Sequence, residues 1–494
     1  MEFTSKSSLF VFLVAFSFLF NFCLNQYNLS VMSEAGKELR LNQSIPTADD
    51  QSYLSPVRNY LETGVWKESE KSVVSYYKRS PGYGFFLLPF LRCFDEGNSL
   101  FVLTIVQCCL QASIAGMLFL LLTQQQFSKI TAGGLALVFG VFPAFNGYSF
   151  YTLTEGVTPF LIFLIMYLSF QKGRTVFILL SIVFSVLLLT RPVFLVLLLL
   201  PFWYFMRIKI NSKWLLGTLG LLICFTPFAL WMNRNYSINE SSLSLHPIYD
   251  AGNANCWRLP HQSIYELVKQ YHPTGSDFHD WNKQLLEGKQ KGLMYNELEN
   301  PLSIFNDQVV TVLPKDSLKL YIGLYYQSLG EVNIYANQNE YSLLEQQVAN
   351  KFLNFKSTYQ NAYFFDAHIK IPSLVFKQLV WSSNLNLFIF WSNEQQFSFN
   401  KTLAYLSSVI FTLIFLFYLL LPLLNYTFFK KYWILFAAVF IYLFYLIYVQ
   451  RGLEKRYIYP LFGPLFFLAL MSCKGLIQQL FKRRNASDIS SGNE

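Results

Sequence analysis

The amino-acid sequence predicts an all-α polytopic membrane protein, a bundle of about ten transmembrane helices with helical extracytoplasmic loops. Composition is the first reason: 53% of the 494 residues are hydrophobic and only 14% are charged, whereas a soluble domain carries roughly 25% charged residues. The second reason is that apolar residues gather in runs close to the roughly 20 residues that a helix needs to cross the hydrocarbon core. The third is that basic residues collect in alternate loops between these runs.

The apolar runs locate the expected spans. They are residues 9–24, 100–122, 130–145, 156–170, 176–189, 193–206, 214–232, 403–424, 432–449 and 458–473. The runs 176–189 and 193–206 are short, which leaves open a re-entrant hairpin or one bent unit interrupted by Thr-Arg-Pro. The first run lacks a small-x-small cleavage site before Asn25, which favours an uncleaved helix over a signal peptide.

The basic loops give the chain an orientation. If the N-terminus is cytoplasmic, the loops around Lys129, Lys172 and Lys430 and the tail 482–494 all lie inside and hold almost no acid, as the positive-inside rule requires. In a membrane protein, a formal net charge of +9 usually reflects basic cytoplasmic loops, here including the loop with Arg207, Lys209 and Lys213. No dense basic run follows a soluble fold, so nucleic acid is not an expected partner. We expect an integral, multi-pass protein of the bacterial inner (plasma) membrane with its active site on the extracytoplasmic side.

The same map predicts four regions. They are an N-terminal bundle at 1–233 that includes a first extracytoplasmic loop at 25–99, an extracytoplasmic loop or small domain at 234–400, C-terminal transmembrane helices at 401–481, and a cytoplasmic tail at 482–494. Within the second loop, residues 369–391 have the pattern of an amphipathic helix that lies on the membrane and leads into the next span.

Two adjacent carboxylates, Asp49 and Asp50, lie just beyond the first span in a chain that otherwise avoids charge. Adjacent carboxylates repel, and near low-dielectric walls the pKa of one tends to rise, which suits a general base or a metal ligand. The simpler interpretation is an N-cap, since Thr-Ala-Asp-Asp could start a helix that contains Tyr53. The two roles are compatible, because a capped helix is a rigid place to mount an acid.

Cations gather at the same predicted face. Lys78 and Arg79 follow the acids, and other arginines stand beside span ends: Arg191, Arg234, Arg451 and Arg456. Arginine and lysine at the mouth of a bilayer suit a lipid phosphate or pyrophosphate. Singly, each is more often a structural residue whose charge extends to the interface. As a set beside paired acids, they favour a site for an anionic lipid.

Two motifs of the first loop carry these residues. In DDQSYLSPVRNYLETGVW, Tyr53 follows Asp49 by four residues, and a Gly-x-Trp closes the stretch. In KRSPGYGFFLLPFL, Arg79 stands shortly before a Pro-Gly-Tyr turn that opens an apolar run.

Three later motifs place further polar residues at span ends. LTEGVTPFLIFL supplies Glu155, LLLTRPVFL supplies Arg191, and EKRYIYPLFGPLFFLAL supplies Arg456 and Tyr457. The order and shared sidedness of these motifs resemble the membrane-embedded glycosyltransferases of the GT-C fold, such as protein O-mannosyltransferases and lipid A aminoarabinose transferases. The resemblance covers residues up to about 236 and resumes over about 369–470.

The resemblance implies a donor sugar on a polyprenyl phosphate, undecaprenyl or dolichyl, whose lipid tail lies between spans. Cations stabilise the departing phosphate while Asp49 takes the proton of an acceptor hydroxyl, and direct displacement inverts the anomeric centre. The acceptor is a glycan, a lipid or a protein. The expected catalytic residues are Asp49 and Asp50, the donor-phosphate residues are Arg79, Lys78, Arg191, Arg234 and Arg456, and further candidates are Tyr53, Glu155 and Tyr457.

No cofactor is required by the sequence. Some members of the resembling family bind a divalent cation near the first loop, but no ligand set here is strong enough to require one, so the metal is unassigned. The stretch HPTGSDFHD at 272–280 could bind metal, although a polar surface turn is the favoured interpretation.

Two other functions share part of this pattern. A polymerase or ligase of lipid-linked glycans shares arginines at this face but has no need of the Asp-Asp-x-x-Tyr loop, so it ranks second. A lipid-linked sugar transporter or flippase needs ionisable groups at mid-membrane depth. The span centres are almost free of charge, which favours an interfacial enzyme.

Overall fold

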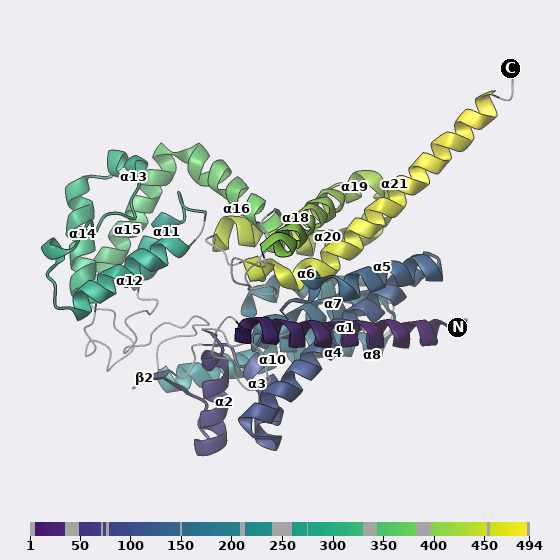
Figure 1. Cartoon of the computed structure of the whole chain (residues 1–494), viewed down its shortest axis with the longest axis horizontal. Helices are drawn as coiled ribbons and strands as arrows, with labels where there is room; N and C mark the ends of the chain where they lie inside the picture. Colours follow the sequence, from purple (N-terminus) through teal and green to yellow (C-terminus); the bar gives the residue numbers. More distant parts are fainter. Residues whose placement is uncertain are drawn as a thin grey trace.

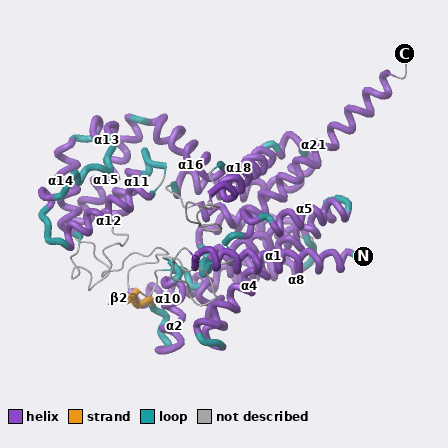
Figure 2. Tube along the Cα trace, in the orientation of Figure 1, coloured by secondary structure: helices purple, strands orange, loops and turns teal. Residues whose placement is uncertain are grey.

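The computed structural model describes residues 5–34, 49–70, 73–75, 79–148, 151–207, 213–239, 259–273, 275–329, 343–381, 397–451 and 455–491. These ranges are helical except for loops and one short antiparallel hairpin (Figures 1 and 2). The hairpin pairs β1 (Glu68–Glu70) with β2 (Val73–Ser75), with Glu68 opposite Ser75. The predicted all-α class is confirmed, with this hairpin as its small exception.

Most helices form one bundle around a continuous apolar core. Its N-terminal half consists of α1 (Lys6–Glu34), α4 (Glu96–Gln124), α5 (Lys129–Val141), α6 (Pro143–Asn146), α7 (Thr158–Phe170), α8 (Arg174–Thr190), the 3₁₀ helix η2 (Pro192–Leu198), α9 (Leu199–Arg207) and α10 (Lys213–Asn239). Its C-terminal half consists of α16 (Ile371–Val380), α18 (Phe397–Leu419), α19 (Leu421–Leu424), α20 (Tyr426–Phe444), the π-helix η7 (Tyr445–Gln450), the 3₁₀ helix η8 (Lys455–Leu461) and α21 (Phe462–Ser491).

Five helices in the described ranges are long and apolar enough to cross a membrane, which makes the chain a multi-pass membrane protein. They span Lys6–Tyr27, Glu96–Gln124, Trp214–Ser237, Tyr426–Gln450 and Arg456–Phe481. Shorter apolar helices occupy Lys129–Val141, Thr154–Phe170, Arg174–Thr190, Pro192–Arg207 and Tyr405–Leu419. Every predicted span falls on one of these helices.

Burial separates central helices from peripheral ones. In α4 and α21 the apolar window is 67% buried within the protein, whereas in α1 and α10 it is only 17% buried. The outer faces of α1 and α10 therefore present large apolar side chains, such as Phe16 and Leu222, to their surroundings. Such exposure is unfavourable in water but favourable against lipid tails.

The two short predicted spans are separate helices that pack against each other. Helix α8 ends at Thr190, and Arg191 adopts extended angles (φ −148°, ψ 102°). The residue before a proline avoids the helical region, so Pro192 breaks the chain here and starts η2. At the rises of 3₁₀ and α-helices, η2 and α9 together reach about 28 Å, close to the roughly 30 Å of the hydrocarbon core. The structure thus shows two packed helical segments of nearly spanning length rather than a re-entrant hairpin or one bent unit.

A second apolar core belongs to a separate group of helices. In the sequence, these helices come after the N-terminal half of the bundle and before its C-terminal half. This helical domain contains α11 (Leu259–Val268), α12 (Ser276–Gln290), η3 (Tyr295–Glu297), α13 (Asp307–Val312), α14 (Lys315–Ser328) and α15 (Leu343–Ala362). Figure 1 shows it at the end of the bundle opposite both termini. The π-helix η5 (Asp366–Lys370) and α16 then return the chain to the bundle.

The predicted amphipathic helix at 369–391 is shorter than expected in the part that can be described. Helix α16 ends at Val380, with Ile371 and Val375 in the core of the bundle and Leu374 exposed. Residues 382–391 lie outside the described ranges.

Candidate functional site

The first loop brings Asp49 to the start of α2 (Gln51–Thr63) without using it as a cap. Asp50 occupies the N-cap position in a helical conformation, is buried, and makes no capping hydrogen bond through its side chain. The Asp49 carboxylate is held by two arginines. Its Oδ1 accepts from Nη2 of Arg79 at 2.7 Å, and its Oδ2 accepts from Nη2 of Arg456 at 2.5 Å. The helix that contains Tyr53 thus begins where the N-cap interpretation placed it, but the side-chain capping hydrogen bond of that interpretation is not formed.

These contacts extend into what we call the arginine network, formed by Arg79, Asp49, Arg456, Glu155 and Arg191. Oε1 of Glu155 lies 2.9 Å from Nη1 of Arg191 and 3.8 Å from Nε of Arg456. Glu155 is fully buried, and Arg456 is mostly buried. Three guanidinium groups share two carboxylates, so the network carries a net charge of +1. A cluster with this excess attracts an anion and repels a divalent cation.

The position of Arg79 depends on a close backbone approach at Gly82, the first residue of α3 (Gly82–Cys93). A Cβ built on Gly82 would lie 2.5 Å from the carbonyl carbon of Leu189 and from the amide nitrogen of Thr190. Because these neighbours are backbone atoms at the end of α8, they cannot rotate away. Glycine thus allows the loop of Arg79 to lie against the end of the helix that precedes Arg191.

We expect Gly82→Ala to lower the free energy of unfolding by about 1–3 kcal/mol, the usual cost of adding a methyl group where there is no room. The measurement is thermal unfolding of the purified protein in detergent. Gly134→Ala is the matched control, because no atom lies within 4 Å of a Cβ at Gly134 and alanine is favoured over glycine inside a helix. Equal melting temperatures for the two variants would contradict this account of Gly82.

Glu155 is placed by a polar contact inside the bundle. It lies in η1 (Thr154–Gly156), next to the buried Gln107 of α4. The side chain of Gln107 donates to the carbonyl of Tyr151 at 3.0 Å and accepts from the hydroxyl of Tyr83 at 2.8 Å. This amide ties α3 and α4 to the turn that carries Glu155, and a buried side-chain amide with several partners fixes that geometry.

Tyrosine rings lie against the arginines. The guanidinium of Arg79 lies 5.2 Å from the ring centre of Tyr53, and those of Arg191 and Arg456 lie 5.0 and 5.7 Å from that of Tyr457. A cation over an aromatic face is attracted by the negative potential of the ring. Tyr53 and Tyr457 therefore hold the guanidinium planes while leaving their N–H edges available for carboxylates or a ligand.

The pKa of Asp49 differs from the sequence-based expectation. Burial alone would raise it, but the charges and hydrogen bonds of Arg79 and Arg456 outweigh burial and hold the pKa of Asp49 below its ordinary value. The predicted rise is therefore wrong for Asp49: its close neighbours are two cations from distant parts of the chain. Asp49 is ionised at neutral pH and can accept a proton, though as a weak base.

A polar pocket of about 560 Å³ opens beside the network. Arg79 and Arg191 line it together with Tyr53 and Tyr457, and its other walls come from η2, α20 and η7. The lining residues are Tyr53, Arg79, Ser80, Thr190, Arg191, Pro192, Val193, Val196, Ile441, Tyr442, Tyr445, Leu446, Gln450 and Tyr457. No carboxylate occurs among these described lining residues.

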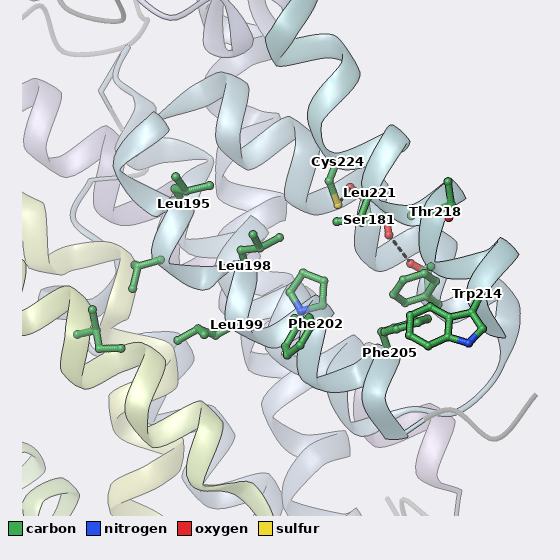
Figure 3. Close-up of a pocket in the computed structure, with 16 residues that line it drawn as sticks. Ser181, Leu195, Leu198, Leu199, Phe202, Phe205, Trp214, Thr218, Leu221 and Cys224 are labelled. Atoms are coloured by element: carbon green, nitrogen blue, oxygen red, sulfur yellow. Dashed lines mark hydrogen bonds between the residues drawn. The ribbon is translucent and has the colours of Figure 1, made fainter.

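An apolar groove of about 710 Å³ lies next to the polar pocket, since Val196 and Ile441 line both. Figure 3 shows its two walls: Leu195, Leu198 and Phe202 face Leu221 and Cys224 across the groove. From Leu195 to Phe205 the groove follows η2 and α9 for about 15 Å at helical rises. Its few polar groups include Ser181, whose hydroxyl donates back to the carbonyl of Phe177. The groove thus offers a ligand almost only apolar contact.

Two predicted arginines lie elsewhere. Arg234 donates to the carbonyl of Trp66 at 2.5 Å and lies over the ring of Trp231, a contact that joins α10 to the first loop. Arg451 contacts the helical domain through Gln270. Lys78 falls outside the described residues.

The metal candidate at 272–280 forms a local ion pair. Nδ1 of His272 lies 3.1 Å from Oδ2 of Asp277. Within the described ranges, no group of three or more histidine, cysteine, aspartate or glutamate side chains could hold a metal ion.

The pocket also contains residues that sequence reasoning missed, among them Tyr442, Tyr445 and Gln450. Tyr442 and Tyr445 lie in an aromatic-rich apolar run, and nothing in that run separates wall tyrosines from lipid-facing ones. The only signal was the position of Gln450 beside Arg451 at the end of a span.

The five members of the arginine network were all predicted site residues, and the structure brings them together from five separate segments. Comparisons with protein-family models, with curated proteins and with solved structures find no match to this chain.

Proposed function

We propose that this protein is a membrane glycosyltransferase that moves a sugar from a polyprenyl-phosphate-sugar donor to an acceptor hydroxyl, with inversion of the anomeric centre. The observation that carries the proposal is that an arginine-lined pocket and an apolar groove lie side by side, with Val196 and Ile441 lining both. A ligand that fits both must have an anionic head and a long apolar tail. Lipid phosphates have this character.

The phosphate binds where Arg79 and Arg191 line the pocket. Guanidinium groups match phosphate oxygens geometrically and keep their charge at any physiological pH. The excess positive charge of the network adds long-range attraction. As the bond from the anomeric carbon to the phosphate oxygen breaks, negative charge grows on the phosphate, and fixed cations stabilise that growth more than they stabilise the ground state.

The tail binds in the groove between η2–α9 and α10. Burial of apolar area stabilises by roughly 25 cal/mol per Å² when the alternative is water, but a tail already in lipid gains little from this exchange. The groove therefore acts mainly by alignment: it holds the tail so that the phosphate meets the arginines. Binding energy used for position lowers the entropic part of a reaction barrier.

Asp49 is not among the described residues that line the pocket, but it is paired with Arg79, which is. From this position Asp49 accepts the proton of the acceptor hydroxyl as that oxygen attacks the anomeric carbon. One carbon–oxygen bond forms, one breaks toward the phosphate, and the electron pair leaves with the lipid phosphate. Because Arg79 and Arg456 lower the pKa of Asp49, proton transfer follows attack rather than preceding it, and Asp49 then passes the proton to solvent. A positioned carboxylate contributes roughly 10²–10⁴-fold in such a role.

The site belongs on the extracytoplasmic face of a bacterial inner membrane under this proposal. The network and pocket lie toward the helical domain, whereas the basic Lys430 and Lys431 begin the same α20 span whose far end reaches Gln450. Basic residues favour the cytoplasmic side.

The test is consumption of donor by the purified full-length chain in lipid nanodiscs, supplied with radiolabelled undecaprenyl- and dolichyl-phosphate sugars and a membrane extract as acceptor. We expect one of these donors to be consumed. If none is consumed but a pyrophosphate-linked glycan is, the protein is a polymerase or ligase of lipid-linked glycans. If neither is consumed and undecaprenyl phosphate does not bind, the proposal fails.

We expect Arg191→Ala to weaken the binding of undecaprenyl phosphate roughly tenfold, the equivalent of one charge-assisted hydrogen bond. Arg207→Ala is the matched control: Arg207 also lies over an aromatic ring, that of Trp203 at 4.4 Å, but it is at the end of α9 remote from the pocket. Titration of the lipid phosphate into both variants gives the measurement. Equal loss of affinity in both would show that the effect is not specific to the pocket.

A further inference from the structure

We propose that Tyr445 and Gln450 form the sugar-binding end of the polar pocket and that they select an uncharged sugar. This inference rests on the proposed function, because it assigns a part of the same pocket. It is carried by the order of groups along one wall, by the chemistry of the pair, and by the contacts that hold Gln450 in place.

Along the wall formed by α20 and η7, the lining residues follow one another from the apolar groove to the opposite end of the pocket. Ile441 is shared with the apolar groove, and Gln450 is the last residue of η7. The nine residue steps from Ile441 to Gln450 correspond to at most about 13 Å at the helical rise of about 1.5 Å per residue. A lipid phosphate whose tail begins at Ile441 and whose phosphate meets Arg191 therefore carries its sugar toward Tyr445 and Gln450.

The pair has the hydrogen-bonding groups that sugar hydroxyls need. The hydroxyl of Tyr445 donates to Oε1 of Gln450 at 2.8 Å, which leaves acceptor lone pairs on the tyrosine oxygen and two N–H groups on the glutamine amide. These groups are neutral, and the rings of Tyr442 and Tyr445 line the pocket beside them. Neutral donors and acceptors next to aromatic faces suit a hydroxylated ring.

The helical domain holds Gln450 in place. Nζ of Lys269, at the end of α11, donates to the backbone carbonyl of Gln450 at 3.2 Å. Nη1 of Arg451 donates to Oε1 of Gln270 at 2.8 Å, and its Nε donates to the carbonyl of Tyr448 at 3.1 Å. Arg451 is therefore a positioning residue rather than a phosphate ligand.

The backbone of Arg451 supports this assignment. Its φ of +41° lies in a region that residues with a side chain rarely adopt, and its side chain is buried. Such a conformation persists only where surrounding contacts determine it. Here Gln270 and Lys269, next to α11 of the helical domain, contact Arg451 and Gln450. The orientation of Gln450 therefore depends on the position of that domain.

The charges around the pair favour a neutral sugar. Arg79 and Arg191 line the pocket, and no carboxylate occurs among the described lining residues. Behind Gln450 lie Lys269 and Arg451. The carboxylate of Glu266 pairs with both Lys269 and Lys356, so these three cations, Arg451 included, outnumber the one acid. A protonated amino sugar would meet like charge from both sides, which is unfavourable at short range. A neutral hexose meets no such repulsion.

The experiment compares the binding of undecaprenyl phosphate with that of its glucosyl, mannosyl and aminoarabinosyl esters, for the full chain in nanodiscs. We expect at least one neutral glycosyl ester to bind more tightly than the bare phosphate and the aminoarabinosyl ester to show no such gain. Gln450→Leu and Tyr445→Phe should each reduce the gain roughly fivefold to tenfold and leave the binding of bare phosphate within about twofold.

Two further variants separate local recognition from general disruption. Gln270→Leu lies outside the pocket and should reproduce the loss in Gln450→Leu, because it removes the side-chain partner that Arg451 has in the helical domain. Tyr448→Phe is the matched control for Tyr445→Phe: Tyr448 belongs to the same η7 but stacks on Phe444 at 4.5 Å and does not line the pocket. It should keep the full gain.

The outcomes separate this inference from the proposed function. If bare undecaprenyl phosphate binds and depends on Arg191, but no neutral ester gains affinity, or the gain persists in Gln450→Leu and Tyr445→Phe, the sugar assignment is wrong and the lipid-phosphate site stands. A gain for the aminoarabinosyl ester equal to that of the neutral esters overturns the charge selection. If bare phosphate does not bind at all, both proposals fall.

Discussion

In purified Asp49→Asn protein, turnover should fall by roughly a hundredfold or more, while binding of undecaprenyl phosphate is retained or strengthened. Asparagine keeps the shape of the side chain but cannot accept the proton of the attacking hydroxyl. It also removes one negative charge from the arginine network, whose net charge rises from +1 to +2 because three guanidiniums then share one carboxylate. Turnover and donor affinity should therefore move in opposite directions.

The control is Asp95→Asn, the same chemical change at an exposed helix cap where the Asp95 side chain accepts from the amide of Asn98. Asparagine caps helices as well as aspartate does, so this variant should keep its turnover. Full turnover in Asp49→Asn would remove Asp49 from the chemistry and leave it as a structural partner of the two arginines.

The same substitution changes the acid stability of the fold. The pKa of Asp49 in the folded protein is below its ordinary value of 3.8, so its ion pairs stabilise the fold above that pH. The stabilisation is lost as the pH falls through the lowered folded-state pKa. A melting-temperature series between neutral pH and pH 3 should thus be flatter in Asp49→Asn than in the wild type.

Arg456→Ala should weaken undecaprenyl phosphate binding by roughly tenfold and lower the free energy of unfolding by about 1.5–3 kcal/mol, the range for hydrogen bonds to charged groups. Arg456 is not among the described residues that line the polar pocket, so its effect on binding comes through the charge of the network. Arg456 bridges Asp49 and Glu155, with Nη2 2.5 Å from one carboxylate and Nε 3.8 Å from the other. Its removal leaves two cations and two carboxylates, so the network becomes neutral and loses its attraction for an anion. Lipid-phosphate titration and thermal unfolding in detergent give the two readouts.

Arg58→Ala is the matched control for a lost ion pair. Arg58 pairs with Glu96 at 2.5 Å, but both side chains are about one-third exposed or more, and such pairs contribute roughly 0–1 kcal/mol. It should leave phosphate binding unchanged. A similar loss of phosphate affinity in Arg58→Ala and Arg456→Ala would contradict the central place of Arg456.

The fold was largely predictable because a helix that faces lipid does not need the alternation of polar and apolar residues that marks a helix at a water-exposed surface. A helix that crosses a membrane is apolar on most of its faces, so the ten apolar runs locate helices directly. Their ends were less predictable. The run predicted at 9–24 belongs to a helix that continues to Glu34, because a helix need not end where its apolar segment ends.

The site was predictable in its members more than in its chemistry. Asp49, Arg79 and Glu155 were expected to meet because each stands at the same predicted end of a span. Sequence proximity, however, pointed to Asp50 as the neighbour that sets the pKa of Asp49, whereas the true neighbours include Arg456, which is 407 residues away. No local pattern reveals a pairing of that range.

The roles of Arg451 and Gln450 were hidden for a different reason. Arg451 and Arg456 stand at the same span end in the sequence, but the wide turns of η7 and the positive φ of Arg451 direct one arginine to the helical domain, while the other joins the network. A conformation that is rare in general is set by tertiary contacts, so no residue preference predicts it.

The carboxylates of Asp49 and Glu155 also set the net charge of the site at each stage of the proposed reaction. A polyprenyl-phosphate-sugar is a phosphodiester with one negative charge, so its binding brings the +1 network to neutrality. After transfer, the lipid phosphate is a monoester that acquires a second negative charge with a pKa near 6, and the proton from the acceptor balances it as long as that proton stays in the pocket. Once the proton escapes, the site holds a net negative charge. Because the cations attract the dianion more strongly than the monoanion, loss of the proton tightens the hold on the spent lipid under the proposed reaction, and acidic conditions would favour release over retention.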